Sequence, residues 1–185
     1  MNATLNLIAS RRSHRAYRPD QLTQDQLQAI LNAALQSPSA VNRQPWHFTV
    51  VQNQELLDEI NLAVRENVMQ KDASLRSPRF ADEQFHVFYH APTVIFIAGD
   101  TENKWAQIDC GIAVQNIALA AESLGLGSVI LGMPREAFQG DKAPAIRKAL
   151  SFPPNYDFVI GIAIGTATDD KDAHPIQEGK IAIVK

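Results

Sequence analysis

The run from Thr93 to Ala98, with the sequence TVIFIA, constrains the fold more than any other segment of the chain. Successive side chains of a β-strand point to opposite faces of a sheet, so a strand that is apolar at every position must be covered on both faces. The run therefore predicts a central strand that lies between two layers of other elements.

Amphipathic helices are available to form these layers. The clearest start is Thr23 with Gln26, a T-x-x-Q capping box in which each side chain satisfies a free amide of the first turn. One apolar helical face follows, formed by Leu27, Ile30, Leu31, Ala34 and Leu35. The residue before a proline avoids the helical region, so Ser37-Pro38 should end this helix.

The remaining elements follow from the same patterns. Further helices are expected at 3–12, 54–67, 105–124 and 134–150, and further strands at 47–51, 127–131, 158–165 and 181–184. Gly125 stands where it would cap the longest helix. The polar segment 68–90 is interpreted as a variable excursion on the surface. We expect one domain over residues 1–185, of the α+β class, with helices around a mixed central sheet.

Composition excludes several classes of protein. With 45% hydrophobic and 20% charged residues, the chain can bury a sizeable core. The net charge of −3 gives no general attraction to nucleic acid or to an anionic membrane. No apolar run approaches the roughly 18 residues of a membrane span, and the N-terminal pattern is not that of a secretory signal. We expect a cytoplasmic protein without nucleic-acid or membrane partners.

The densest chemical signal is the segment Arg11-Arg12-Ser13-His14-Arg15, followed by Arg18. Arginine suits phosphate, because its planar guanidinium group donates two parallel hydrogen bonds to an oxyanion. The segment also stands where the first helix should end, and cations favour a helix C-terminus. On spacing alone, a solvated helix end is the favoured interpretation.

A second signal is the loop from Ser37 to Trp46, with the sequence SPSAVNRQPW. Two prolines restrict its backbone, and the hydroxyl and amide side chains between them can bond the edges of a polar heterocycle. Taken alone, such a stretch between a helix and a strand is usually just a loop. Trp46 is more simply a core residue.

In combination, the two segments resemble the FMN-dependent nitroreductase family. The stretch RRSHRAY is followed, after one amphipathic helix, by SPSAVNRQPWHF. The resemblance continues in DCGIAVQN at 109–116, in LGLG at 124–127 and in the segment 161–165. The motifs stand in the family's order over residues 5–165, and their combination is specific although no single motif is. The resemblance implies a nitroreductase-like fold whose terminal strand, 181–184, is exchanged with a partner subunit.

The resemblance also implies a cofactor site built from several segments. The FMN phosphate and the polar edge of the ring would be held by Arg11, Arg12, Ser13 and Arg15. The flavin would also be contacted by a loop of the second subunit, through Ser37, Pro38, Ser39, Asn42 and Gln44. Backbone groups that face the flavin, including an amide for its N5 atom, would come from Ile130, Leu131 and Gly132. A late cation that reaches the phosphate would be Lys171, although the family's usual arginine beside it is replaced by Ala173, next to His174.

The implied activity is that of an NAD(P)H-dependent FMN oxidoreductase working as a homodimer. Bound FMN would take electrons from NADH or NADPH and pass them to a small-molecule acceptor, a nitroaromatic, a quinone or a related compound, by a ping-pong mechanism. Hydrogen-bond donors around the ring would stabilise its reduced form. Protons would come from water, so we assign no catalytic side chain and no metal ligand.

Two alternatives from other classes remain open: a flavin-binding sensor or carrier with little turnover, and a family member that has lost its cofactor.

Other motifs carry less weight. The glycines of LGLG run from helix to strand, the reverse of a dinucleotide fingerprint. His86 and His90 are more simply an unliganded surface pair than metal ligands. Cys110, the single cysteine, is interpreted as a core residue.

Overall fold

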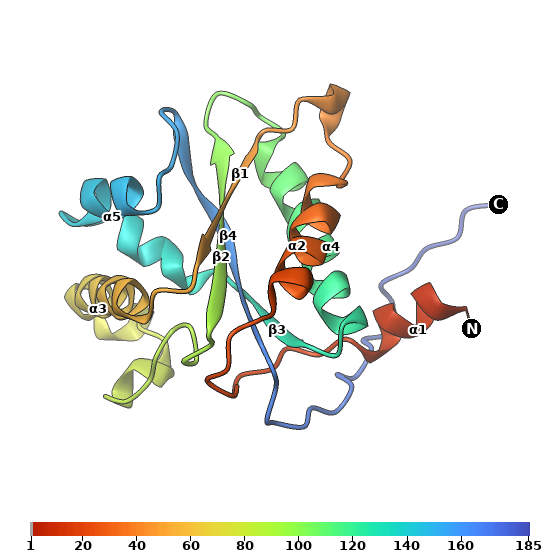
Figure 1. Ribbon diagram of the computed structural model, residues 1–185, viewed down its shortest axis with the longest axis horizontal. Coiled ribbons are helices and arrows are strands. Elements are labelled where there is room, and N and C mark those ends of the chain that lie inside the picture. The colour runs from red at the N-terminus through yellow and green to blue at the C-terminus, as the bar shows by residue number, and fades with distance from the viewer. Residues whose placement is uncertain (1) are drawn as a thin grey trace.

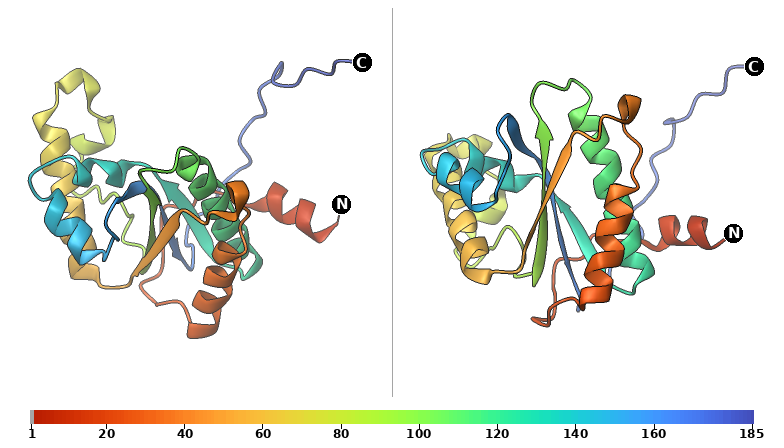
Figure 2. Two further views of the ribbon diagram at one scale, coloured as in Figure 1. Left: turned by 90° about the horizontal axis from the view of Figure 1, so that it is seen from above. Right: turned by 45° about the horizontal axis from the view of Figure 1, so that its top comes forward.

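The computed structural model describes residues 2–185, in which an antiparallel sheet lies between two helical layers (Figure 1). The order of the sheet is β1-β2-β4-β3, and its strands are β1 (Trp46–Val51), β2 (Thr93–Asp100), β3 (Gly127–Leu131) and β4 (Tyr156–Gly165). The α-helices are α1 (Ala3–Ser10), α2 (Gln24–Leu35), α3 (Gln54–Gln70), α4 (Ala106–Ser123) and α5 (Ala143–Ala149). Helices α3 and α5 cover one face of the sheet, and α2 and α4 cover the other (Figure 2).

Strand β2 confirms the prediction made from the TVIFIA run. Every residue from Thr93 to Gly99 is buried. Val94 and Phe96 join the apolar cluster on the α3 side, whereas Ile95 and Ile97 join the cluster that contains α4. The alternation of a strand thus divides one apolar run between two cores.

The predicted helix caps are also confirmed. The Thr23 hydroxyl accepts the Gln26 N–H at 3.2 Å, and the Gln26 side chain accepts the Thr23 N–H at 2.9 Å. At the end of α4, Gly125 adopts φ +72°, and the N–H of Leu126 donates to the carbonyl of Ala121 at 3.0 Å. This is a Schellman cap, in which glycine accepts the left-handed conformation without strain.

The expectation of a mixed sheet is wrong. All four strands pair antiparallel, and the one parallel contact with β3 is an isolated bridge between Ser13 and Ser128. A strand that is apolar at every position is typical of parallel sheets. Here the two helical layers bury an antiparallel sheet on both faces instead.

Two helix predictions also need correction. The expected helix at 134–150 is divided into a 3₁₀ segment, η4 (Met133–Phe138), and the short helix α5. Pro144 explains the break, because proline is tolerated only in the first turn of a helix. Leu35, assigned to the buried face of α2, is 57% exposed, since the helix ends at this residue.

The segment 68–90 is not simply a surface excursion. Helix α3 continues to Gln70, and two short 3₁₀ turns follow, η2 (Ala73–Leu75) and η3 (Pro78–Ala81). Phe80, Val87 and Phe88 are buried in the core. These apolar side chains lie among polar residues and recur with neither a helical nor a strand period, so the sequence pattern does not reveal them.

His86 is correspondingly buried, so the interpretation of His86 and His90 as a surface pair is wrong for one member. The two rings lie 4.5 Å apart, and His86 Nε2 is 3.2 Å from Asp58 Oδ1. Burial, and then the neighbouring His90, lower the pKa of His86. No group of three or more potential metal-binding side chains is found within residues 2–185.

Both ends of the chain project from the body of the protein on the side of α4 (Figures 1 and 2). Helix α1 has no buried residue. The expected strand at 181–184 does not form within the chain, where Ile181, Ile183 and Val184 are 79–95% exposed. A strand requires a hydrogen-bonded neighbour, and the projecting tail has none among the described residues. None of the helices in residues 2–185 combines the length and apolar character that a membrane crossing requires.

Candidate functional site

The arginine segment, residues 11–18, lies along the outer edge of the sheet (Figure 1). The His14 N–H donates to the Ser128 carbonyl at 3.0 Å, at the start of β3. Further along, the Arg18 N–H donates to the Thr166 carbonyl at 2.9 Å, just beyond the end of β4. These contacts hold the segment from His14 to Arg18 in an extended conformation against two strands, directly after the end of α1.

Asp169 joins the arginine segment to Lys171. Its carboxylate accepts the Arg15 N–H at 3.0 Å, lies 2.9 Å from His14 Nδ1 and pairs with Lys171 Nζ at 3.2 Å. Partial burial raises the pKa of Asp169, but these three hydrogen bonds outweigh it and hold the pKa at about 2. Lys171 is thus brought beside the arginine segment. Sequence reasoning missed Asp169, although the acidic pair directly before Lys171 was the available signal.

The guanidinium groups of the segment have donors to spare. Arg12 Nη1 donates to the Ala9 carbonyl at 2.7 Å. One nitrogen of this guanidinium group therefore does bind the end of α1, as the helix-end interpretation expects. Among residues 2–185, no ion pair joins a carboxylate to Arg11, Arg12 or Arg15, and Arg12 Nε is buried without a hydrogen-bond partner. Guanidinium groups without a carboxylate partner, one of them with an unused buried donor, fit an anion such as the phosphate of FMN.

The open edge of β3 supplies a backbone donor next to this cluster. The carbonyl of Ser128 points outward to His14, and backbone groups alternate along a strand, so the N–H of Ile130 faces the same open edge. Leu131 instead pairs with Gly161 of β4 and is buried. Gly132 stands in open space, since a Cβ placed there would meet no atom within 4 Å.

A side chain from the segment 68–90 also borders the arginines. The guanidinium of Arg15 lies 5.9 Å from the centre of the Tyr89 ring. Tyr89 has a positive φ of 54°, an uncommon conformation for a residue other than glycine. Sequence analysis gave no signal for this residue, because the contact depends on how the irregular segment folds back.

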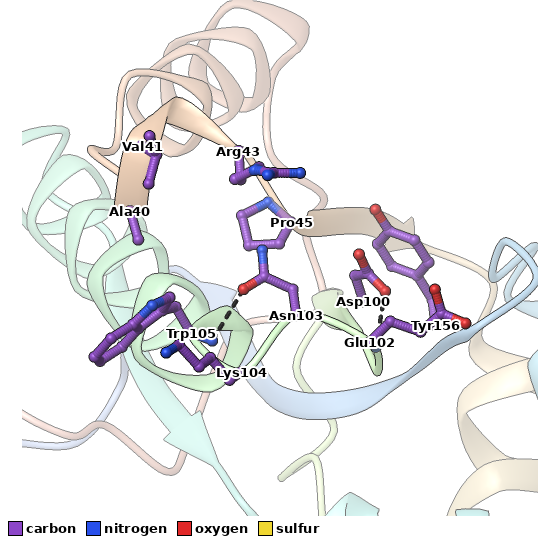
Figure 3. A pocket seen from close by; sticks show the side chains of 10 residues that line it. All are labelled: Ala40, Val41, Arg43, Pro45, Asp100, Glu102, Asn103, Lys104, Trp105 and Tyr156. Carbon is purple, nitrogen blue, oxygen red and sulfur yellow. Dashed lines mark hydrogen bonds between the residues drawn. The ribbon is translucent and has the colours of Figure 1, made fainter.

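The loop 37–45 lies against the other end of the sheet and over the start of α4 (Figure 3). Val41, Asn42 and Gln44 have φ values of 54°, 54° and 49°. For a β-branched residue such as Val41 this conformation is a true outlier, and the side chain is 90% exposed. Beside the loop is a cavity of about 520 Å³ whose lining includes Arg43, Trp105 and Tyr156.

The loop and the arginine segment of one chain lie at opposite ends of β4. Asp100, which donates its N–H to the Pro45 carbonyl at 2.9 Å, pairs with Tyr156 at the start of β4. Gly165, at the end of β4, lies against Tyr17. The ten residues of β4 span about 30 Å at roughly 3.3 Å per residue. The structure therefore does not bring Ser39, Asn42 and Gln44 to the arginines of the same chain, whereas Ser37 lies nearer the middle of the molecule, against Asn116 of α4.

Comparison with known proteins places the chain in a family. Residues 8–166 match the Nitroreductase family, and the chain belongs to that family. It is 35% identical over 173 residues to a relative from Archaeoglobus fulgidus with the provisional name NADH dehydrogenase/NAD(P)H nitroreductase, a match that covers 93% of this chain and 90% of the relative.

Solved structures agree with this assignment. A nitroreductase with bound FMN from Desulfitobacterium hafniense is 36% identical, covers 100% of both chains and has a TM-score of 0.94. A second, from Bacteroides fragilis and also with bound FMN, is 31% identical over 100% of both chains, with a TM-score of 0.92. The nitroreductase-like α+β fold expected from the sequence is confirmed.

Proposed function

We propose that this protein is an FMN-dependent oxidoreductase that transfers electrons from NADH or NADPH to a small organic acceptor, such as a nitroaromatic or a quinone. The observation that carries the proposal is the arginine segment beside the open edge of β3, whose guanidinium groups pair with no carboxylate of residues 2–185. The names and bound FMN of the relatives support the same activity.

Each part of this region has a role toward FMN. Arg11, Arg12 and Arg15, with Ser13 and Lys171, bind the phosphate and the polar edge of the ring. Asp169 keeps Lys171 beside the segment and leaves the guanidinium groups free for the anion. The N–H of Ile130 would donate to the ring of bound FMN and would favour its reduced, more negative form. When bound, FMN supplies the redox chemistry itself, and no catalytic side chain is assigned.

A homodimer completes the site. The loop residues Ser37, Pro38, Ser39, Asn42 and Gln44 reach the flavin of the partner subunit, because the tip of the loop and the arginines of the same chain lie at opposite ends of β4. Large apolar side chains are exposed along one side of α4 and on α1, namely Trp105, Ile108, Ile112, Leu5 and Ile8. An eight-residue helix with no buried side chain is not stable by itself, and contact with a second chain supplies the missing packing.

The cytoplasm is the proposed place of action. Cys110 is a free, buried thiol with Sγ 3.9 Å from the Ala98 carbonyl, which confirms it as a core residue. Burial, and then the neighbouring Asp109, raise the pKa of this thiol to about 12. A lone, inert thiol fits a reducing compartment.

The first test is the cofactor. The purified protein should be yellow, and heat release followed by chromatography should yield FMN and not FAD. A colourless protein that does not change the fluorescence of added FMN would overturn the proposal and favour a family member without its cofactor.

The second test is turnover. Oxidation of NADH and of NADPH should be followed at several concentrations of a quinone and of a nitroaromatic. Parallel lines in double-reciprocal plots are expected, since the donor must leave before the acceptor binds in a ping-pong mechanism. Tight FMN binding with negligible turnover on every acceptor would instead identify a flavin sensor or carrier.

A further inference from the structure

We propose that Asp109 and Asn116 are positioning residues that hold the loop 37–45 in the conformation with which it completes the partner's flavin site. This inference rests on the proposed function, since it needs FMN and a dimer. Both residues belong to the motif DCGIAVQN, to which the binding of FMN described above gives no role. Neither touches the arginine segment, and both contact the loop.

Two hydrogen bonds join helix α4 to the start of the loop. The Ala40 N–H donates to the Asp109 carboxylate, at 3.3 Å from both oxygens. The Asn116 side chain donates to the Ser37 hydroxyl at 2.9 Å. Asp109 is 3% exposed and Ser37 is 7% exposed, so neither contact is a chance surface interaction. Removing either partner leaves a buried polar group unsatisfied.

The spacing of the two contacts matches on both sides. Asp109 and Asn116 are seven residues apart, which places them about 10 Å apart along one face of a helix. Ser37 and Ala40 are three residues apart, and an extended chain spans about 10 Å over that distance. Ser39 is extended, with φ −138° and ψ 156°. The loop therefore runs along α4 with one contact at each end of a straight segment.

The strained part of the loop begins immediately after the second contact. Val41 and Asn42 follow Ala40 in the left-handed region, and Gln44 does the same two residues later. Such conformations persist only where the surrounding structure determines them. The loop's own hydrogen bonds, from the Gln44 N–H to the Ser39 hydroxyl at 2.9 Å and from the Gln44 side chain to Asn42 Oδ1 at 3.0 Å, fix its tip. Asp109 and Asn116 fix its base.

The decisive test measures FMN affinity by fluorescence titration of the apo-protein. Asp109→Ala should raise the dissociation constant of FMN by about tenfold, because a hydrogen bond to a buried charged group is lost. Asp109→Asn keeps an oxygen acceptor without the charge and should raise it by only about threefold. Asn116→Ala should fall between them. Gln107→Ala, an exposed position on the same helix, is the matched control and should bind as the wild type does.

Mixed dimers separate a positioning role from general destabilisation. One chain carries Asp109→Ala and the other Arg15→Ala, each with its own affinity tag. If the loop acts on the partner's site, both defects fall in one site, the other site is intact, and each mixed dimer binds one FMN tightly. If Asp109 acts within its own chain, both sites are defective and no tight binding remains, which would overturn the inference.

Hydrogen exchange of the apo-protein tests the contacts without FMN. Exchange at residues 39–44 should be faster in Asp109→Ala and unchanged in Gln107→Ala. Wild-type affinity in Asp109→Ala and Asn116→Ala would overturn this inference alone, whereas a wild type that does not bind FMN would overturn the proposed function as well. If Asp109→Ala does not fold, Asp109→Asn and Asn116→Ala decide the matter.

Discussion

The two ends of the sheet are built on opposite principles. At the end where β3 begins, the backbone of residues 11–18 is relaxed and hydrogen-bonded, while guanidinium groups keep unused donors. At the end where β1 begins, the polar side chains of the loop 37–45 are largely satisfied, while its backbone is strained at Val41, Asn42 and Gln44. One end thus offers free hydrogen-bond donors on charged side chains, and the other offers a backbone of fixed, strained conformation.

Under the proposed function, this difference would explain how a single chain carries two half-sites. A charged ligand requires donors that no internal carboxylate has already neutralised. A flat ring requires a surface of fixed shape, and strained loops of fixed shape are common at functional sites. The arginine segment and the tip of the loop 37–45 are separated by the length of β4. The proposed function therefore requires a dimer, in which the loop of one chain meets the arginines of the other. Changes at both ends of the sheet and in the C-terminal tail test this difference.

The largest effect is expected from removing the C-terminal tail. Deleting residues 176–185 removes Ile176, Ile181, Ile183 and Val184, which are 79–95% exposed in the single chain. Burying one such side chain contributes about 1.5–3 kcal/mol, so burial of even two in the dimer predicts at least a hundredfold weaker association. Light scattering over a dilution series, together with FMN retention, measures both. A full-length monomer that binds FMN tightly would show that each chain holds a complete site.

Next in size is the effect of the arginines. Arg11→Ala and Arg15→Ala should each weaken FMN binding by about tenfold to a hundredfold, because a charge-assisted hydrogen bond contributes about 1.5–3 kcal/mol. The apo-protein should lose at most about 1 kcal/mol of stability, the usual dipole contribution at a helix end. Arg18→Ala is the control, since Arg18 is exposed and lies beyond the motif. Equal and minor losses of FMN affinity in all three variants would show that the cluster is only a solvated helix end.

A smaller effect is expected from Asp169 and depends on pH. Its pKa is about 2 in the folded chain against an ordinary value of 3.8, so its contribution to stability is present above about pH 4 and is lost as the pH falls toward 2. Allowing for solvent screening, the contribution is about 1 kcal/mol. Urea unfolding at pH 5 and at pH 2.5 should therefore show a steeper loss in the wild type than in Asp169→Asn. An equal loss of unfolding free energy between pH 5 and pH 2.5 in both proteins would mean that the carboxylate is not held by its three donors.

The smallest effect concerns the strained end. Val41→Gly should stabilise the apo-protein by about 0.5 kcal/mol, because relief of a left-handed β-branched residue slightly exceeds the entropic cost of glycine. Leu75→Gly is a matched control, since Leu75 is 74% exposed but has no positive φ, and this change should destabilise. Urea unfolding at one fixed protein concentration compares the two. A loss of stability in both would argue that the strain at Val41 is absent in solution.

Local patterns were sufficient to predict most of the elements and the family. The capping box at Thr23, the glycine cap at Gly125 and the buried strand from Thr93 to Ala98 depend on neighbours close in sequence, and all three are confirmed. The family motifs were recognisable for the same reason, because each is a short contiguous stretch. Chain direction within the sheet was not predictable in this way, since apolar runs look alike in parallel and antiparallel sheets.

Tertiary structure alone decided what meets at the site. Asp169 reaches His14 and Arg15 across more than 150 positions of sequence, and Asp109 reaches Ala40 across almost 70. No periodicity links such residues, because their contact depends on how β3, β4 and α4 pack together. The same packing buried Phe88 and His86 in a segment that is polar by composition. It also placed the arginine segment and the loop at opposite ends of β4. Short contiguous motifs were therefore enough to identify the groups of the proposed flavin site, whereas the packing of β3, β4 and α4 keeps the loop tip and the arginine segment of one chain apart.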